Sequence, residues 1–424
     1  MTASLRVAIN AQLVGNGRAG GVESAVRGLV HALGRLDGGD TEYVVVTHPW
    51  AAHWLDGALG PTQRTVVHPY PARVRFRPLL ERVRRRLGPA RAALRPLWKT
   101  VQARADAPSR PERSRGFFES LGVDVVHFPY QAMVLTSIPS LYNPWDLQHL
   151  HHPELFDPAV FARREATYPV YCRHAHAVAV ASRFTAADVV ARYGVDRDRA
   201  FVIPLAAATA LGAPPAAATL ARVRAAHRLP ERFALYPAAA WPHKNHLRLL
   251  EALARLRDRD GIVVNLVATG ARNEFWPAVE RRVAELGLAT QTWFLGFVDA
   301  ETLRALYRLA TLVVIPSLFE GWGFPLIEAF HEGVAVASSS AASLGEYAGD
   351  AALLFDPTSV DAIAAALARL ASDVALRADL VERGRRRAQA FSWERAARAH
   401  RALYRKVAGM KLGPEDEALL AEAR

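Results

Sequence analysis

Short apolar runs rich in β-branched residues alternate along the chain with longer segments of helical periodicity. Such runs are typical of buried strands in a parallel sheet, and helical segments between them are typical of βαβ units. The predicted strands are 5–10, 43–47, 65–68, 123–128, 177–181, 201–204, 233–237, 263–268, 292–295, 311–316, 334–338 and 352–355. The pattern therefore predicts an α/β protein.

The alternation stops once, at the Ala-rich stretch 205–220, which contains Pro214 and Pro215 and reads as a linker. It then resumes, which indicates two domains with a boundary near residue 210, and a length of 424 residues suits that number. Predicted helices include 22–33, 183–193, 246–257, 275–287, 300–309, 360–371 and 375–389. Ser392 can cap a further helix.

The segment 317–329 places Glu320 and Glu328, with seven residues between them, around a turn that contains Gly321 and Gly323. A strand precedes this turn, and Pro325 suits the first turn of a helix after it. Free backbone amides at a helix start favour a phosphate, whereas carboxylates accept hydrogen bonds from sugar hydroxyls. A nucleotide sugar carries both groups.

Each acid also has a simpler interpretation. Glu328 alone is more readily explained as a solvated residue that complements the helix dipole. Glu320 lies between Phe319 and Trp322, which would desolvate its carboxylate at a cost unless it has a partner. Lys244 follows the first strand of the second domain and is placed to neutralise a diphosphate, although most lysines are solvated surface groups.

The run 143–153 contains His149, His151 and His152, which raises the alternative of a metal site. Metal sites need matched geometry and usually a carboxylate, so we expect no metal here. His127 ends a strand and is either a polar contact for a ligand or a capped strand-end histidine.

The composition indicates the cellular compartment in which the protein is expected. Cys172 is the only cysteine, which excludes an internal disulfide and is consistent with a reducing cytoplasm. No apolar run reaches the roughly 18 residues that span a bilayer, and the amino terminus has no pattern of an export signal. We therefore expect a cytoplasmic protein.

The net charge of +12 is concentrated in residues 73–115, where 14 Lys and Arg stand against three acidic residues. Helical spacing of apolar residues beside the arginines suits contact with an anionic membrane, at the inner face of the plasma membrane. A solvated arginine-rich helix explains the same pattern equally well. No nucleic-acid motif accompanies the charge, so no nucleic-acid partner is expected.

In its whole length, segment 317–329 resembles the E-x7-E signature of family four retaining glycosyltransferases of the GT-B fold. Pro-His-Lys-Asn at 242–245 and the pair Gly20-Gly21 also resemble that family. The resemblance implies two Rossmann-like domains facing a central cleft: 1–210, with a basic insertion at 71–117, and 211–391, with 392–424 returning to the first domain. It further implies transfer from a nucleotide sugar to a hydroxyl of a glycan or lipid-linked acceptor in bacterial surface polysaccharide or glycoconjugate synthesis.

The resemblance also assigns roles to residues. Glu320 would hold donor-sugar hydroxyls, Glu328 would hold the ribose diol and Lys244 would hold the diphosphate. The expected catalytic residues are Glu320, Lys244 and Asp146. The expected donor-binding residues are Gly20, Gly21, Lys244, Glu320, Gly321, Trp322, Gly323, Phe324 and Glu328. His127, Trp145 and His149 are candidates for sugar or acceptor contacts. No cofactor is expected, because the nucleotide sugar is a substrate. No metal is expected, because no Asp-x-Asp of the metal-using sugar transferases appears in a suitable loop.

Two positions depart from the family pattern. Ala239 replaces a frequent arginine, and Trp145 replaces a histidine that reaches the donor sugar. Because an indole leaves a hexose 6-hydroxyl without a partner, Trp145 favours a 6-deoxyhexose donor. A GT-B nucleotide-sugar epimerase and a non-catalytic sugar-nucleotide-binding protein are the alternatives.

Overall fold

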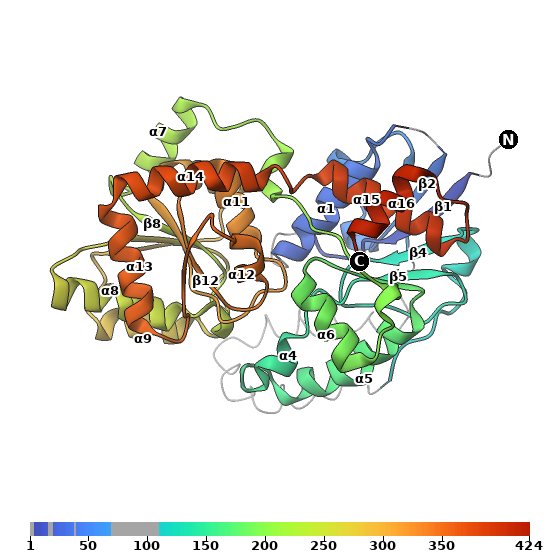
Figure 1. Cartoon of the computed structure of the whole chain (residues 1–424), viewed down its shortest axis with the longest axis horizontal. Helices are drawn as coiled ribbons and strands as arrows, with labels where there is room; N and C mark the ends of the chain where they lie inside the picture. The colour runs from blue at the N-terminus through green and yellow to red at the C-terminus, as the bar shows by residue number, and fades with distance from the viewer. Residues whose placement is uncertain (1–3, 16–19, 38–39, 69–109) are drawn as a thin grey trace, which may run out of the picture. The chain divides into compact units, whose positions relative to one another are not determined.

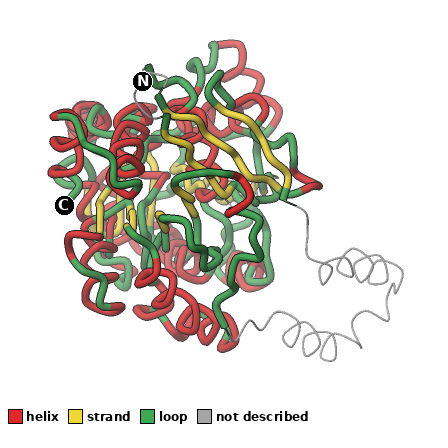
Figure 2. The backbone as a smooth tube through the Cα atoms, turned by 90° about the vertical axis from the view of Figure 1, so that its right-hand side faces the viewer, coloured by secondary structure: helices red, strands yellow, loops and turns green. Residues whose placement is uncertain are grey.

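The computed structural model describes residues 4–15, 20–37, 40–68 and 110–424 (Figure 1). The predicted basic segment 73–115 lies outside the described residues except for its last six positions, and the predicted insertion at 71–117 lies largely outside them too. Figure 2 shows the strands flanked by helices and loops.

The first sheet has seven strands in the order β3-β2-β1-β4-β5-β6-β7, and the described pairs from β3 to β6 are parallel. Its strands are β1 (Leu5–Asn10), β2 (Thr41–Thr47), β3 (Gln63–Val67), β4 (Val125–Phe128), β5 (Ser140–Tyr142), β6 (Ala177–Val180) and β7 (Ala200–Val202). The accompanying helices are α1 (Gly21–Leu33), α4 (Gln148–His151), α5 (Pro158–His174), α6 (Arg183–Tyr193), α15 (Trp393–Val407) and α16 (Pro414–Glu422). The central strands β1 and β4 are almost entirely buried, as their apolar sequences predict.

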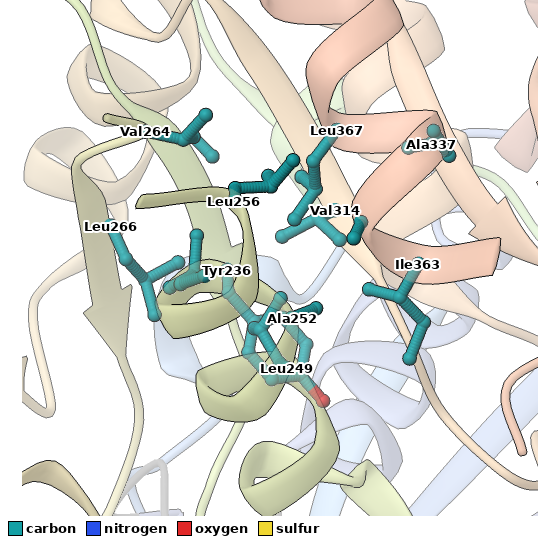
Figure 3. Close-up of a cluster of buried hydrophobic side chains, with 14 of the residues drawn as sticks. Tyr236, Leu249, Ala252, Leu256, Val264, Leu266, Val314, Ala337, Ile363 and Leu367 are labelled. Atoms are coloured by element: carbon teal, nitrogen blue, oxygen red, sulfur yellow. The ribbon is translucent and has the colours of Figure 1, made fainter. Parts of the chain in front are cut away.

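The second sheet has six parallel strands in the order β10-β9-β8-β11-β12-β13. These are β8 (Ala234–Pro237), β9 (Leu266–Thr269), β10 (Thr292–Gly296), β11 (Leu312–Ile315), β12 (Val336–Ser339) and β13 (Leu353–Phe355). The helices are α7 (Ala217–Ala226), α8 (His246–Asp260), α9 (Trp276–Glu285), α10 (Ala300–Leu309), α11 (Phe324–Glu332), α12 (Ser343–Ala348), α13 (Val360–Ser372) and α14 (Val374–Ala388). Leu249 of α8 and Ile363 and Leu367 of α13 belong to one buried cluster with Val314 of β11 (Figure 3).

The chain divides into two compact units. The first unit comprises residues 1–179, 188–201 and 397–424, and the second comprises 180–187 and 202–396. Within the first unit, Arg405 of α15 pairs with Asp40 at 2.7 Å and with Asp416 of α16 at 2.9 Å, which joins the C-terminal helices to the loop before β2. The predicted domain boundaries at 210 and 391 stay predictions.

Most elements lie where the hydrophobic pattern predicts them, and β1, α6 and α10 match to the residue. The prediction missed β5, which has only three residues, and α5, which is weakly amphipathic and contains Pro169. The linker prediction is wrong at its end, because α7 begins at Ala217. Short or weakly periodic segments carry too few apolar positions to define a period.

Candidate functional site

Two loops of the second unit bring a lysine and a glutamate together. They follow the carboxyl ends of β8 and β11, which are neighbours in the sheet. Lys244 ends a 3-10 turn in the first loop, and Glu320 lies in the second. Lys244 Nζ and Glu320 Oε1 are 2.5 Å apart, and the two side chains are only 17% and 12% exposed. Glu320 therefore has the partner that its apolar neighbours require.

Electrostatics keeps Glu320 ionised. Burial by itself would raise the pKa of this carboxyl, but the Lys244 ammonium and His243 lower it, and its pKa ends below the ordinary value. At neutral pH the pair is thus a carboxylate beside an ammonium ion. The carboxylate accepts hydrogen bonds from hydroxyls, and the ammonium binds phosphate oxygens.

Side-chain and backbone hydrogen bonds hold the two loops in place. Asn245 has the left-handed conformation, with φ of +62°, and its buried amide donates to the carbonyls of Pro316 and Pro357 at 2.9 and 2.7 Å. The Ser343 hydroxyl donates to the Glu320 carbonyl at 2.7 Å. These contacts preorganise the ion pair. The sequence alone indicated no such role for Asn245 or Ser343, because each of them bonds to a residue that is distant in the chain.

Gly323 marks the start of α11 and needs glycine. Its φ is +90°, and a Cβ there would lie 2.7 Å from Leu344 Cδ2. Pro325 occupies the first turn of the helix, as predicted. The first N–H groups of a helix have no partner within the helix, so this end is suited to an anion.

Trp322 and Phe324, on either side of Gly323, are largely buried. The Trp322 ring packs against Tyr347 at 4.3 Å and Phe391 at 5.5 Å between centroids. These contacts stabilise the turn, and donor contacts by the two side chains stay predictions.

Glu328 lies on α11 and is 6% exposed, so its interpretation as a solvated residue is wrong. Tyr307 of α10 donates a hydrogen bond to Glu328 Oε2 at 2.7 Å. Burial raises the pKa of Glu328 to about 7, while the Tyr307 hydrogen bond opposes the shift and Glu332 adds to it. Glu328 therefore changes charge near neutral pH.

A small cavity of about 10 Å³ lies among the carboxyl ends of β8, β9 and β10. Gly270 lines it with φ of +124°, and a Cβ there would lie 2.5 Å from the Ala238 backbone. Arg272 also lines it and lies over the Trp276 ring at 4.6 Å. Sequence reasoning missed this loop, although a glycine directly after an apolar run was a usable signal.

In the first unit, the predicted glycines follow β1, and Trp145 and Asp146 follow β5. Gly20 has φ of +56° and precedes α1, whose first residue is Gly21, and both glycines are exposed. Trp145 has φ of +71°, and its indole N–H donates to the Pro129 carbonyl at 2.9 Å. Asp146 accepts the Gln148 amide at 3.1 Å and lies 3.5 Å from Arg164.

The predicted histidine contacts are buried. His127 is fully buried, with Nδ1 2.7 Å from Tyr404 Oη and Nε2 2.9 Å from Asn143 Oδ1. His149 is also fully buried, and its Nε2 lies 2.9 Å from Glu165 Oε1. Either ring would have to give up a hydrogen bond to reach a ligand through these nitrogens, so a sugar contact stays a prediction.

The histidine run does not converge on one point. His151 pairs with Asp188 at 2.6 Å and His152 with Glu154 at 3.2 Å, whereas His149 pairs with Glu165. Within the described ranges, no group of three or more His, Cys, Asp or Glu side chains is arranged to hold a metal ion.

The structure thus groups the predicted residues by unit. Lys244, Glu320, Gly321, Gly323 and Glu328 belong to the second unit, together with Trp322 and Phe324. Gly20, Gly21, His127, Trp145, Asp146 and His149 belong to the first unit.

Sequence comparison matches residues 220–387 to the family model of glycosyl transferases group 1. The O-antigen chain mannosyltransferase B of Escherichia coli is 37% identical over 166 residues, which are 38% of this chain and 42% of that protein. The MMP alpha-(1->4)-mannosyltransferase of Mycolicibacterium hassiacum is 32% identical over 230 residues, 53% of each chain. The chain thus matches only about half the length of these relatives or less.

Comparison of folds extends over nearly the whole chain. The sucrose-phosphate synthase of Thermosynechococcus elongatus aligns with a TM-score of 0.66 at 20% identity, covering 95% of this chain and 99% of that one. Anabaena HepE in complex with UDP and glucose aligns with a TM-score of 0.67 at 16% identity, covering 95% and 100%.

The predicted fold class is confirmed: the chain has two Rossmann-like α/β units and the fold of solved GT-B proteins. Among the described residues, no helix is both long and apolar enough to cross a membrane. Residues 220–387, which contain Lys244, Glu320 and Glu328, are similar in sequence to glycosyl transferases of group 1.

Proposed function

We propose that the protein is a retaining, metal-independent glycosyltransferase that moves a sugar from a nucleotide-sugar donor to a hydroxyl of a glycan or lipid-linked acceptor. The buried pair of Lys244 and Glu320 beside the start of α11 is the observation that carries the proposal. It combines a cation for phosphate, a carboxylate for hydroxyls and a helix end for an anion.

The match of residues 220–387 to group 1 glycosyl transferases supports this chemistry. The relatives named as mannosyltransferases do not favour the epimerase alternative. One of them is named for the O-antigen chain, which supports a role in bacterial surface polysaccharide synthesis. We place the enzyme in the cytoplasm or at the inner face of the plasma membrane, where such an acceptor would be available.

In the proposed reaction, the bond from the sugar to the diphosphate breaks and the diphosphate leaves with the electron pair. The acceptor oxygen attacks from the same face and forms the new bond to the sugar, while its proton passes to the departing diphosphate. The configuration is thus retained without a protein nucleophile. Lys244 and the start of α11 stabilise charge on the departing diphosphate, while Glu320 orients the sugar through its hydroxyls. Gly20 and Gly21 approach the donor phosphate, and Glu328 accepts from the ribose diol.

A panel of donors and acceptors tests the proposal. The protein is incubated with nucleotide sugars that include a mannose and a 6-deoxymannose nucleotide, with and without lipid-linked glycans. We expect acceptor-dependent release of nucleoside diphosphate, an unchanged anomeric configuration in the product, and full activity in a chelator. Turnover of only the 6-deoxyhexose nucleotide would support the specificity role of Trp145.

The same panel contains the outcomes that contradict the proposal. An isomerised donor sugar would establish an epimerase, and binding of the donor without any turnover would establish a non-catalytic protein. An inverted product or loss of activity in the chelator would reject the retaining or the metal-independent part alone.

A further inference from the structure

A second pocket lies at the amino ends of the strands of the second sheet, and we call it the amino-edge pocket. It has a volume of about 530 Å³ and is lined by Thr311 and Val334, which lie at the amino ends of β11 and β12. Lys244 and Glu320 follow the carboxyl ends of β8 and β11. Because the strands are parallel, the pocket lies at their amino ends, and Lys244 and Glu320 lie at the opposite, carboxyl ends.

The lining of this pocket combines arginines with apolar side chains. Arg308 comes from α10, and Arg377 and Arg385 come from α14. Val374 and Val381 of α14 supply apolar surface, and Val374 is 66% exposed. The pocket thus places apolar and cationic side chains next to each other.

Positive charge in the pocket exceeds negative charge. Glu332 is the one acidic residue among the described residues of the lining, and its carboxylate already accepts from Arg304 and Arg308 at 2.8 Å each. Arg377 donates to the carbonyls of Leu370 and Ala371. These contacts leave the Arg377 charge without a counter-ion among the residues that the structure describes.

The Arg385 guanidinium has no hydrogen bond or ion pair with any residue in the described ranges. Its guanidinium lies against Gly333, where a Cβ would be 2.8 Å from Nη2. Gly333 is the C-cap of α11, and a helix carboxyl end attracts a cation. That attraction accounts for the position of Arg385, and the carbonyls at the end of α13 account for Arg377. Among the described residues of the lining, no acidic side chain pairs with either charge.

We propose that the amino-edge pocket binds an organic phosphate. Arg385 and Arg377 would hold the phosphate oxygens, because guanidinium groups match phosphate geometry. Val374 and Val381 would cover an apolar group attached to the phosphate. The volume is in the range of small-molecule sites. The ligand is either a free organic phosphate or the headgroup of an anionic lipid.

Calorimetric titration of the full chain with hexyl phosphate, kept below its micellar concentration, tests this site. We expect hexyl phosphate to bind at least about tenfold more tightly than inorganic phosphate, because of the apolar lining. Arg385→Gln should weaken binding by about tenfold or more. Arg386→Gln, on the same helix but outside the lining, should leave it within about twofold.

Equal binding by the Arg385→Gln and Arg386→Gln variants would overturn the proposal. So would equal affinity for hexyl and inorganic phosphate. Flotation with phosphatidylcholine vesicles, with and without phosphatidic acid, separates the two sources of ligand. Binding to the phosphatidic acid vesicles that Arg385→Gln abolishes identifies a lipid headgroup, and binding of hexyl phosphate alone identifies a free organic phosphate.

Discussion

At the scale of single residues, the environment of each carboxylate determines its charge. Glu320 and Glu328 are the two glutamates of the same sequence motif, and both are largely buried. Glu320 has an ammonium partner that lowers its pKa, whereas Glu328 has a neutral tyrosine partner and a raised pKa of about 7. The two acids are therefore chemically distinct, and each carries its own prediction.

The first prediction concerns the ion pair. Glu320→Gln and Lys244→Gln should each lower kcat by about 10²–10³-fold, because each removes a charged group from the proposed donor site and leaves the other unpaired. The double variant should lose less than the product of the two effects, since the groups act as a pair. Steady-state kinetics checks this, with Lys411→Gln as a control on an exposed lysine. Kinetics like the wild type in either single variant would exclude the proposed site.

The second prediction concerns Glu328 and pH. A ribose diol donates hydrogen bonds, so the ionised carboxylate should bind nucleotide better than the acid. With a pKa of about 7, affinity for a nucleoside diphosphate should fall about tenfold between pH 8 and pH 6.

Titration calorimetry at both pH values measures this effect. Glu328→Gln should bind weakly and should show only the pH dependence of the ligand itself. An equal pH dependence in both proteins would remove Glu328 from the nucleotide contacts.

At the scale of elements, the site depends on how strands end and helices begin. The β11 strand leads through a turn into α11, and Gly323 makes that turn with φ of +90°. Asn245 makes the corresponding connection between the 3-10 turn after β8 and α8. The sequence showed the glycines and the proline of the first connection. It did not show that Asn245 bonds to the loops after β11 and β13, because those partners lie 71 and 112 residues away.

A substitution at Gly323 tests the turn. Gly323→Ala should destabilise the second unit by about 1–3 kcal/mol through backbone strain, and overlap with Leu344 should add to the loss. Gly261→Ala is the matched control, because Gly261 also has positive φ, +66°, but open space around its Cβ position. Urea unfolding should show the larger loss for Gly323→Ala. Equal losses would mean that Leu344 does not restrict the turn.

At the scale of the whole molecule, buried titratable groups set the response to acid. Burial lowers the pKa of His246 to about 4, so its contribution to stability is complete above pH 6.5 and is lost as pH falls through 4. Glu328 acts in the opposite sense, since its contribution is complete below pH 4.5 and is lost as pH rises through 7. Each shift corresponds to about 3 kcal/mol, so the two nearly cancel between pH 4.5 and 6.5. His127 is fully buried with a strongly lowered pKa, so acid should destabilise the protein overall.

Removal of the opposing group makes this prediction specific. Glu328→Gln should lose more stability than the wild type between pH 7 and pH 5, by about 2 kcal/mol. Unfolding in urea at the two pH values measures the difference. An equal or smaller loss in the variant would show that Glu328 is ionised well below pH 7 in the folded protein.

The sequence by itself determined the α/β class, the described strands except β5, most of the longer helices, and the glycine turn with its two glutamates. These features are local, since a strand, a helix start or a turn depends on residues adjacent in the chain. Only the tertiary structure decided that Lys244 pairs with Glu320, that Glu328 is buried against Tyr307, and that His127 and His149 are enclosed. It also decided that Arg308 of α10 and Arg377 and Arg385 of α14 line one pocket. Burial and pairing depend on contacts between distant segments, and the hydrophobic pattern of one segment carries no information about its partner.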